Sequence, residues 1–195
     1  MSPLKLKDSS FSPEKKDGVV ATVMLVVVNP AGTMQNTRNL IRHKSLGIVM
    51  QLDSKVVVIT GAARGLGRAY AVAMAAEGAS VFVSDINDCS ETVAEVEAAG
   101  GRIASTIADI SDMKSCQAMA DAVVDTFGKI DVLVNNAALY ATLKGSRFED
   151  LEEAQWDAVM NVNIKGVWQC CKAVVRTGSG SLFIIKCCIS RAFHS

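Results

Sequence analysis

The residues best suited to chemistry stand between Thr60 and Gly67, where the sequence reads TGAARGLG. Glycines in such a segment allow a tight turn and let the backbone come close to a pyrophosphate. A helix that starts near Gly65 would add its N-terminal N–H groups and the positive end of its dipole, which favour a bound phosphate. The same letters could instead form a turn that merely needs small residues, so the interpretation depends on the neighbouring elements.

An acidic residue stands at a matching distance from this segment. Asp85 follows Gly67 by 18 positions and ends an apolar run. In dinucleotide-binding folds, a carboxylate about 20 residues after the glycines accepts hydrogen bonds from the adenosine ribose. The spacing therefore predicts that Asp85 binds a ribose hydroxyl.

Strands and helices are expected to alternate around these residues. The β-branched run at 55–60 is typical of a buried parallel strand. Such strands, alternating with helices of about 9–15 residues, indicate βαβ units and a parallel sheet. We expect strands over residues 55–60, 81–85, 102–109 and 132–135, with a fifth over 181–185, and helices over 65–78, 91–99, 113–127 and 151–175.

The helix over 151–175 contains a polar residue on an otherwise apolar stripe. The stripe recurs at three- and four-residue steps and consists of Trp156, Met160, Asn163, Val167, Cys171 and Val174. An amide in that position must find partners or costs about 1–3 kcal/mol. Asn163 is therefore expected to be either structural or functional.

The chain divides into three parts by composition. Residues 1–49 are a leader of uncertain structure, in which Val19–Val28 could be a stray strand, an unstructured stretch or a signal-peptide core. Residues 50–176 form the regular α/β domain, and 177–195 form a divergent tail. Arg38, Arg42 and Lys44 could alternatively make the leader a targeting segment, although its early acidic residues argue against an organelle presequence.

Four segments in order resemble the short-chain dehydrogenase/reductase family. They are the TGxxxGxG pattern at 60–67, the Asp109-Ile110 pair, the NNAA sequence at 135–138 and the NVNIKG sequence at 161–166. The third segment is similar to the family's NNAG motif, with Ala138 in place of the usual glycine. The resemblance covers about residues 51–175 and implies a Rossmann-type doubly wound parallel sheet, incomplete at the C-terminus.

The resemblance also implies a function and a set of site residues. Members are NAD(P)-dependent oxidoreductases that move a hydride between the nicotinamide and a small-molecule alcohol or ketone. Asn163 falls on the family's catalytic asparagine, and no metal ligand is implied. The expected cofactor-binding residues are Gly61, Arg64, Gly65, Leu66, Gly67, Asp85, Asp109, Ile110, Asn136 and Ala137.

Two residues point to different cofactors. Arg64 resembles the basic residue that holds the 2′-phosphate in NADP-using members, whereas Asp85 would repel that phosphate and bind a 2′-hydroxyl. An exposed ion pair is worth only about 0–1 kcal/mol, which does not offset a carboxylate in contact with a phosphate. NAD is therefore expected, with NADP the less favoured alternative.

The family's remaining catalytic residues have no clear counterpart. Its tyrosine and the lysine four residues later follow the long helix, whereas the sequence's Tyr140–Lys144 pair precedes that helix and is expected to border the substrate side. Cys187 falls on the position of the family's serine, and Ser190 matches only with an insertion. We therefore expect a chain truncated before the Tyr-x-x-x-Lys motif and inactive by itself, a non-catalytic nucleotide-binding remnant or an unstable fragment. Homo-oligomer formation is doubtful for such a chain.

Composition narrows the remaining classes of function. Lys plus Arg and Asp plus Glu are 20 each, so the chain lacks the basic excess of nucleic-acid-binding proteins. No apolar run reaches the roughly 18–20 residues that span a bilayer. The six cysteines include no CxxC pair and are expected to be reduced core thiols. A cytoplasmic location is the expectation.

Overall fold

The computed structural model describes residues 19–28, 52–140, 147–177 and 182–191. They form one six-stranded sheet with the order β1-β6-β5-β2-β3-β4. The strands are β1 (Val19–Val28), β2 (Val56–Thr60), β3 (Ser80–Asp85), β4 (Arg102–Ile107), β5 (Val132–Asn135) and β6 (Leu182–Arg191). The helices are α1 (Gly65–Ala76), α2 (Ser90–Ala98), α3 (Met113–Phe127), α4 (Glu153–Met160) and α5 (Val167–Thr177), with a short turn η2 (Phe148–Asp150) and a π-helical segment η3 (Asn161–Gly166).

Strands β2 to β6 pair in parallel, which confirms the predicted doubly wound α/β fold. All residues of β2 and β5 are buried, whereas β4 at the edge of the sheet has none that is fully buried. Because β3 and β5 flank β2 on opposite sides, the order of the strands reverses between β2 and β5. In open α/β sheets, ligands bind beside the carboxyl ends of the strands at this switch point.

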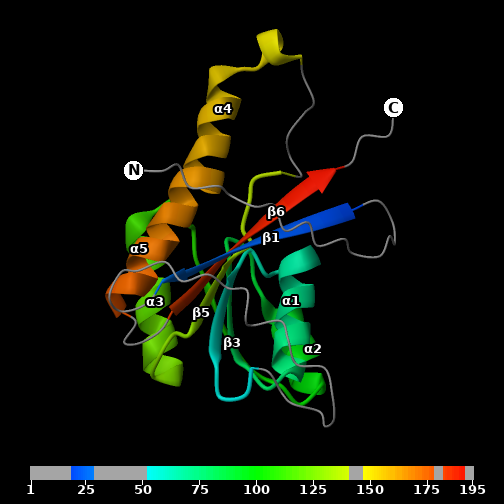
Figure 1. Cartoon of the computed structure of the whole chain (residues 1–195), viewed down its shortest axis with the longest axis vertical. Helices are drawn as coiled ribbons and strands as arrows, with labels where there is room; N and C mark the ends of the chain where they lie inside the picture. Colours follow the sequence, from blue (N-terminus) through cyan, green and yellow to red (C-terminus); the bar gives the residue numbers. More distant parts are fainter. Residues whose placement is uncertain (1–18, 29–51, 141–146, 178–181, 192–195) are drawn as a thin grey trace, which may run out of the picture.

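Helices cover both faces of the sheet (Figure 1). One core forms where α3 and α5 pack on alternate strand residues such as Val58, Phe82 and Leu133. The second core forms on the opposite face under α1 and α2, around Ile59 and Val83. The alternation of side chains along each strand divides the apolar residues between these two cores.

The two ends of the chain meet in the sheet. Val19–Val28, expected as a stray strand or an unstructured leader, forms β1 and pairs antiparallel with β6 along its whole length. The two strands lie side by side in Figure 1, drawn in blue and red. The fifth strand expected at 181–185 is present but extends to Arg191. Because β1 pairs with β6, the fifth parallel strand is not an edge of the described sheet.

The prediction of a regular helix over 151–175 is wrong in one respect, because the π-helical segment η3 interrupts the helix. A π turn takes more residues than an α turn, so an apolar stripe drawn for a regular helix is not continuous across it. Trp156 and Met160, expected in the stripe, are 50% and 38% exposed. The buried face of α5 consists instead of Gln169, Cys170, Ala173 and Val174.

Three of the cysteines, Cys89, Cys116 and Cys170, are buried free thiols, as the sequence predicted. Cys171 is partly buried and also free. The side chains of Cys187 and Cys188 lie outside the described residues. None of the described helices is both long and apolar enough to cross a membrane.

Candidate functional site

The glycine-rich turn lies between β2 and α1 at the switch point of the sheet. Gly61 and Gly65 have φ angles of +68° and +61°, a left-handed conformation that L side chains rarely adopt. A Cβ on Gly61 would also lie 2.6 Å from the Cα of Ala137, so the turn contacts the end of β5. Nothing lies within 4 Å of such an atom on Gly65, where only the backbone conformation requires glycine.

Gly67 brings the start of α1 close to the turn. A Cβ on Gly67 would lie 2.7 Å from the Cα of Ala62 and 2.7 Å from Nδ2 of Asn136, and would clash with the carbonyl oxygen of Gly61. Three glycines thus hold a helix N-terminus against a backbone loop with little side-chain cover. This is the arrangement in which backbone N–H groups can approach a pyrophosphate.

The NNAA sequence after β5 supports the turn from behind. Nδ2 of Asn136 donates to the carbonyl oxygens of Thr60 (3.0 Å) and Gly61 (2.8 Å). The N–H of Ala137 donates to the Thr60 hydroxyl at 3.2 Å. The structure therefore brings Asn136 and Ala137 to the turn, where the Asn136 amide binds its backbone and the Ala137 N–H binds the Thr60 side chain.

Asp85 lies at the carboxyl end of β3, beside the turn. Its Oδ2 accepts the N–H of Ala63 at 3.1 Å, and its Oδ1 accepts both the N–H and Nδ2 of Asn87 at 3.0 Å. A carboxylate offers about four acceptor positions, so about one is left for another donor. These bonds fix the carboxylate beside the loop that would carry the pyrophosphate.

Arg64 and Leu66 flank Gly65 at the start of α1. Arg64 is exposed, in extended conformation, and forms no ion pair with any described residue. Leu66 is half-buried. Arg64 is thus the cation at the turn whose charge is available to a ligand.

The Asp109-Ile110 pair follows β4, and its members face different surroundings. Asp109 is exposed, and its Oδ1 accepts the N–H (2.8 Å) and hydroxyl (2.7 Å) of Ser111. Ile110 is only 5% exposed and belongs to the core under α3 and α5. The side chain of Ile110 thus packs in the core, and Asp109 is the exposed member of the pair.

Asn163 lies within η3, and both ends of its amide bind the main chain of Leu139. Its Oδ1 accepts the Leu139 N–H at 2.7 Å, and its Nδ2 donates to the Leu139 carbonyl at 3.2 Å. The polar residue on the stripe has therefore found partners, and its side chain holds the segment after β5 in place. A π-helical turn occurs often at functional sites and rarely elsewhere.

Sequence reasoning missed a polar clamp on the turn. Nη2 of Arg68 donates to the Ala63 carbonyl (2.5 Å) and to Oε2 of Glu91 (2.7 Å), while its Nε donates to the hydroxyl of Thr92 (3.1 Å). The Thr92 hydroxyl itself donates to the Ala62 carbonyl at 2.7 Å. Arg68 and Ala63 are only five positions apart, but Glu91 and Thr92 stand more than twenty positions from the residues they bind, so no local pattern could reveal the whole clamp.

Gln169 was also missed, although it stands between positions of the expected stripe. It is 3% exposed, and its Nε2 donates to the carbonyls of Ile110 (3.1 Å) and Ser111 (2.9 Å). Gln169 could have been predicted from the sequence, because it is a second polar residue near the apolar face of this helix. Through this amide, α5 holds the loop that follows β4.

The structure does not test the prediction that the family's tyrosine and lysine are missing and that Tyr140 lies on the substrate side. Tyr140 follows the NNAA sequence and is 49% exposed, and Lys144 lies outside the described residues. The other tyrosine, Tyr70, is followed four positions later by Met74. The side chains of Cys187 and Ser190 are also outside the described part.

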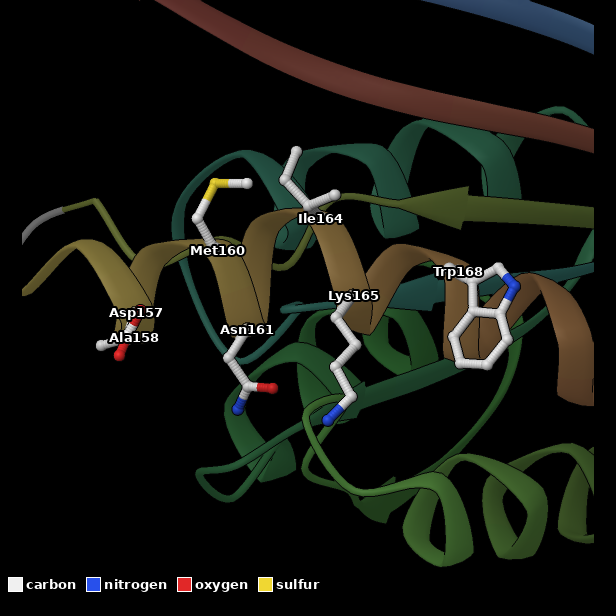
Figure 2. A pocket seen from close by; sticks show the side chains of 7 residues that line it. All are labelled: Asp157, Ala158, Met160, Asn161, Ile164, Lys165 and Trp168. Atoms are coloured by element: carbon white, nitrogen blue, oxygen red, sulfur yellow. The ribbon is translucent and has the colours of Figure 1, made fainter. Parts of the chain in front are cut away.

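Concave regions of the described surface include one along α4, η3 and α5 and one beside the glycine-rich turn. The larger, of about 760 Å³, runs along the outer side of α4, η3 and α5, with Met160 and Ile164 on one side of the helix and Lys165 on the other (Figure 2). The smaller, of about 450 Å³, lies beside the glycine-rich turn and is lined by Ala63, Arg64, Arg68, Asn87, Asp88, Ser90 and Glu91. We place the candidate site at the smaller one, since residues of the glycine-rich turn line it and Asp85 accepts a hydrogen bond from one of them, Ala63.

Charge is concentrated around the smaller cavity. Burial and, to a smaller extent, the nearby carboxylates of Asp85 and Asp88 raise the pKa of Cys89 to about 11, against the opposing charge of Arg68. Cys89 is thus a protonated thiol rather than a nucleophile at neutral pH. No group of three or more His, Cys, Asp or Glu side chains among the described residues could hold a metal ion.

Comparison with known proteins places the chain in a family. The model of the short chain dehydrogenase family matches residues 55–187. The chain is 38% identical over 127 residues to the hydroxy(phenyl)methylsuccinyl-CoA dehydrogenase subunit BbsD of Thauera aromatica, which covers 64% of this chain and 50% of that protein. It is also 38% identical over 128 residues to the 3-oxoacyl-(acyl-carrier-protein) reductase FabG of Thermotoga maritima, covering 65% of this chain and 51% of the reductase. The chain therefore spans about half the length of these relatives.

A solved structure supports the same assignment. The carveol dehydrogenase of Mycobacterium avium, solved in complex with NAD, superposes with a TM-score of 0.61 at 29% identity, over 65% of this chain and 50% of that one. The family model spans β2 to the first half of β6, which includes the turn, Asp85 and the NNAA sequence. The chain therefore belongs to the short-chain dehydrogenase/reductase family, whose members use NAD(P).

Proposed function

We propose that these residues form the NAD-binding part of an oxidoreductase that acts on a small-molecule alcohol or ketone. The observation that carries the proposal is the contact between the glycine-rich turn and Asp85, whose Oδ2 accepts the Ala63 N–H at 3.1 Å. This contact puts a ribose-binding carboxylate next to a helix N-terminus that can hold phosphates. When bound, NAD would accept or supply the hydride.

The turn suits a dinucleotide because its glycines allow a tight loop with little side-chain cover at the start of α1. Any side chain on Gly61 or Gly67 would meet backbone of Ala137 or Ala62. The N–H groups at the start of α1 would hold the pyrophosphate, and the remaining acceptor position of Asp85 would bind a ribose hydroxyl. Asn136, Thr60 and Asn163 would position the backbone around this site rather than react.

We propose NAD rather than NADP on electrostatic grounds. Asp85 is fixed by hydrogen bonds from both Ala63 and Asn87, so it cannot readily turn away from a 2′-phosphate. Arg64, the available cation, is exposed, and exposed charge pairs contribute only about 0–1 kcal/mol. The carboxylate therefore outweighs the arginine.

A glycine substitution tests dinucleotide binding. In Gly61→Ala, the new methyl group would overlap Ala137 and disturb the turn, so we expect NADH affinity to fall at least tenfold by calorimetric titration. Gly128→Ala is the matched control, since Gly128 has a similar φ of +78° at the end of α3 and no atom within 4 Å of the added Cβ. Equal losses in both variants, or no NADH binding by the unaltered chain, would contradict the proposal.

A non-catalytic nucleotide-binding role is the second candidate. It is favoured by the position of Tyr140, which lies between β5 and α4, whereas the family's tyrosine follows the long helix. We expect the 195 residues by themselves to bind NADH but to oxidise it slowly or not at all with ketones. Ketone-dependent loss of NADH absorbance, abolished in Gly61→Ala, would instead support catalysis by this chain.

A further inference from the structure

Five charged side chains surround the cavity beside the turn, and they are not equivalent. Arg64, Arg68, Asp88 and Glu91 line the cavity, and Asp85 lies next to it. If all five are ionised, the acids exceed the bases by one. The electrostatic potential that a bound ligand group would meet here depends on which of these five charges are already paired within the protein.

Arg68 has its charge compensated within the protein. Its guanidinium binds the Ala63 carbonyl, the Thr92 hydroxyl and the Glu91 carboxylate, and its side chain is only 26% exposed. The ion pair with Glu91 measures 2.7 Å. Without Glu91, Nη2 would keep its bond to Ala63 but would lose the partner that neutralises it.

Ala63 connects this ion pair to Asp85. Its carbonyl accepts from Arg68, and its N–H donates to Oδ2 of Asp85. Arg68 and the ribose-binding carboxylate therefore bind the two consecutive peptide groups that meet at the Cα of Ala63. A 2′-phosphate at Asp85 would bring a charge of about −1.5 to −2 near this guanidinium.

We propose that Glu91 is a specificity-determining residue, which acts through Arg68 to keep the cavity from accepting a 2′-phosphate. This inference rests on the proposed function, because it assumes that an adenosine ribose lies beside Asp85. Glu91 contributes in two ways. Its own charge repels a phosphate, and its ion pair withdraws Arg68 from any ligand.

The test compares two nucleotides that differ only in the 2′-phosphate. Adenosine 5′-monophosphate and adenosine 2′,5′-bisphosphate are titrated into the full chain by calorimetry at low, fixed salt. We expect Glu91→Gln to raise the ratio of bisphosphate to monophosphate affinity about fivefold, as expected for one charge removed several ångströms from a phosphate in a watery cleft. Glu91→Asp, which keeps the charge, should leave the ratio within about twofold of the unaltered chain.

Glu95→Gln is the matched control, since Glu95 stands one turn further along α2, is exposed and does not line the cavity. We expect its ratio to change less than twofold. The double variant Glu91→Gln with Arg68→Gln should lose most of the gain, because the freed guanidinium is then absent. A purely structural role for Glu91 would weaken both nucleotides together and leave the ratio unchanged.

The outcomes separate this inference from the proposed function. If both nucleotides bind and the ratio in Glu91→Gln stays at its starting value, or rises equally in Glu95→Gln, the role of Glu91 is refuted and nucleotide binding stands. If the gain survives in the double variant, the route through Arg68 is refuted. If neither nucleotide binds the unaltered chain, the proposed function fails and this inference fails with it.

Discussion

The half of the molecule that carries the glycine-rich turn and the helical arm opposite it are built differently. The turn half, residues 52–140, contains most of the large fully buried side chains, including Ile59, Phe82 and Met119. The arm, residues 153–177, buries only one face of α5 and no residue of α4. Its outer side exposes Trp156 and Trp168, which are 50% and 56% accessible.

This difference shows how the protein fixes the glycine-rich turn. In the turn half, packing on both faces of the sheet holds the strands, and hydrogen bonds from Asn136, Arg68 and Thr92 then fix the loop carbonyls. The arm reaches the site through single amides, Asn163 to Leu139 and Gln169 to Ile110. Side-chain packing dominates the stability of residues 52–140. The arm is connected to the segments near the turn mainly through the polar contacts of these two amides.

The largest expected contrast comes from removing one aromatic ring in each region. Phe82 is 2% exposed and packs edge-on against Phe127 at 6.3 Å between ring centroids, so Phe82→Ala should lower the free energy of unfolding by about 3–5 kcal/mol. Trp156→Ala removes a larger side chain from α4 but should cost only about 0.5 kcal/mol. Urea unfolding monitored by circular dichroism measures both, and comparable losses would refute the contrast.

A smaller effect is expected at the buried amide of the arm. Gln169→Leu leaves the carbonyls of Ile110 and Ser111 without their donor and should cost about 2 kcal/mol of unfolding free energy. Gln117→Leu is the control, since its amide bonds only the exposed Asp121 and should cost less than about 0.5 kcal/mol. If the two variants unfold at the same urea concentration, the buried amide does not connect the arm to the site as described.

The smallest expected effect on the free energy of unfolding comes from Asp131, which lies just before β5, and this effect depends on pH. Burial acts to raise the pKa of Asp131, but the hydrogen bonds from Lys129 and the Val56 N–H and the charges of Lys129 and Lys55 hold it below its ordinary value. Because the folded-state pKa is the lower one, this carboxylate stabilises the fold above its unfolded pKa of about 3.9, and that stability is lost as pH falls through the folded pKa.

The corresponding substitution is Asp131→Asn, which should cost about 1–2 kcal/mol at pH 7 and progressively less below about pH 4. Asp125→Asn, at an exposed position of α3, should cost little at either pH. Unfolding free energies measured from pH 7 to pH 2.5 give the comparison. A cost for Asp131→Asn that does not shrink on acidification would show that its charge is unimportant.

Local patterns predicted much of the turn half. The strands at 55–60, 81–85 and 132–135 and the helix at 113–127 appear within one or two residues of their expected bounds. Gly78 ends the first helix with a φ of +88°, as a glycine after a helix should. These features depend on runs of neighbouring residues, where apolar spacing and glycine placement act directly.

The arm was predicted less well, because its conformation depends on contacts from other elements. The apolar spacing of 151–175 fits a regular α-helix, and nothing in it indicates the π turn at Asn161–Gly166. That turn accompanies two non-local contacts, the bonds of Asn163 to Leu139 and the packing of Ile110 against Gly166, where a Cβ would lie 2.8 Å from Cδ1 of Ile110. A stripe drawn from the sequence alone therefore put Trp156 and Met160 on the wrong face.

The sequence alone determined the glycine-rich turn, the position of Asp85 at the end of β3 and the βαβ pattern, since each depends on residues that are close together in the chain. Which groups hold the turn in place was decided only by the tertiary structure. Asn136 reaches Gly61 across 75 positions, and Arg68 reaches Glu91 across 23. The pairing of β1 with β6 joins segments more than 150 positions apart. Hydrogen bonds over such separations form only where the sheet order brings their partners together, and no local spacing encodes that order.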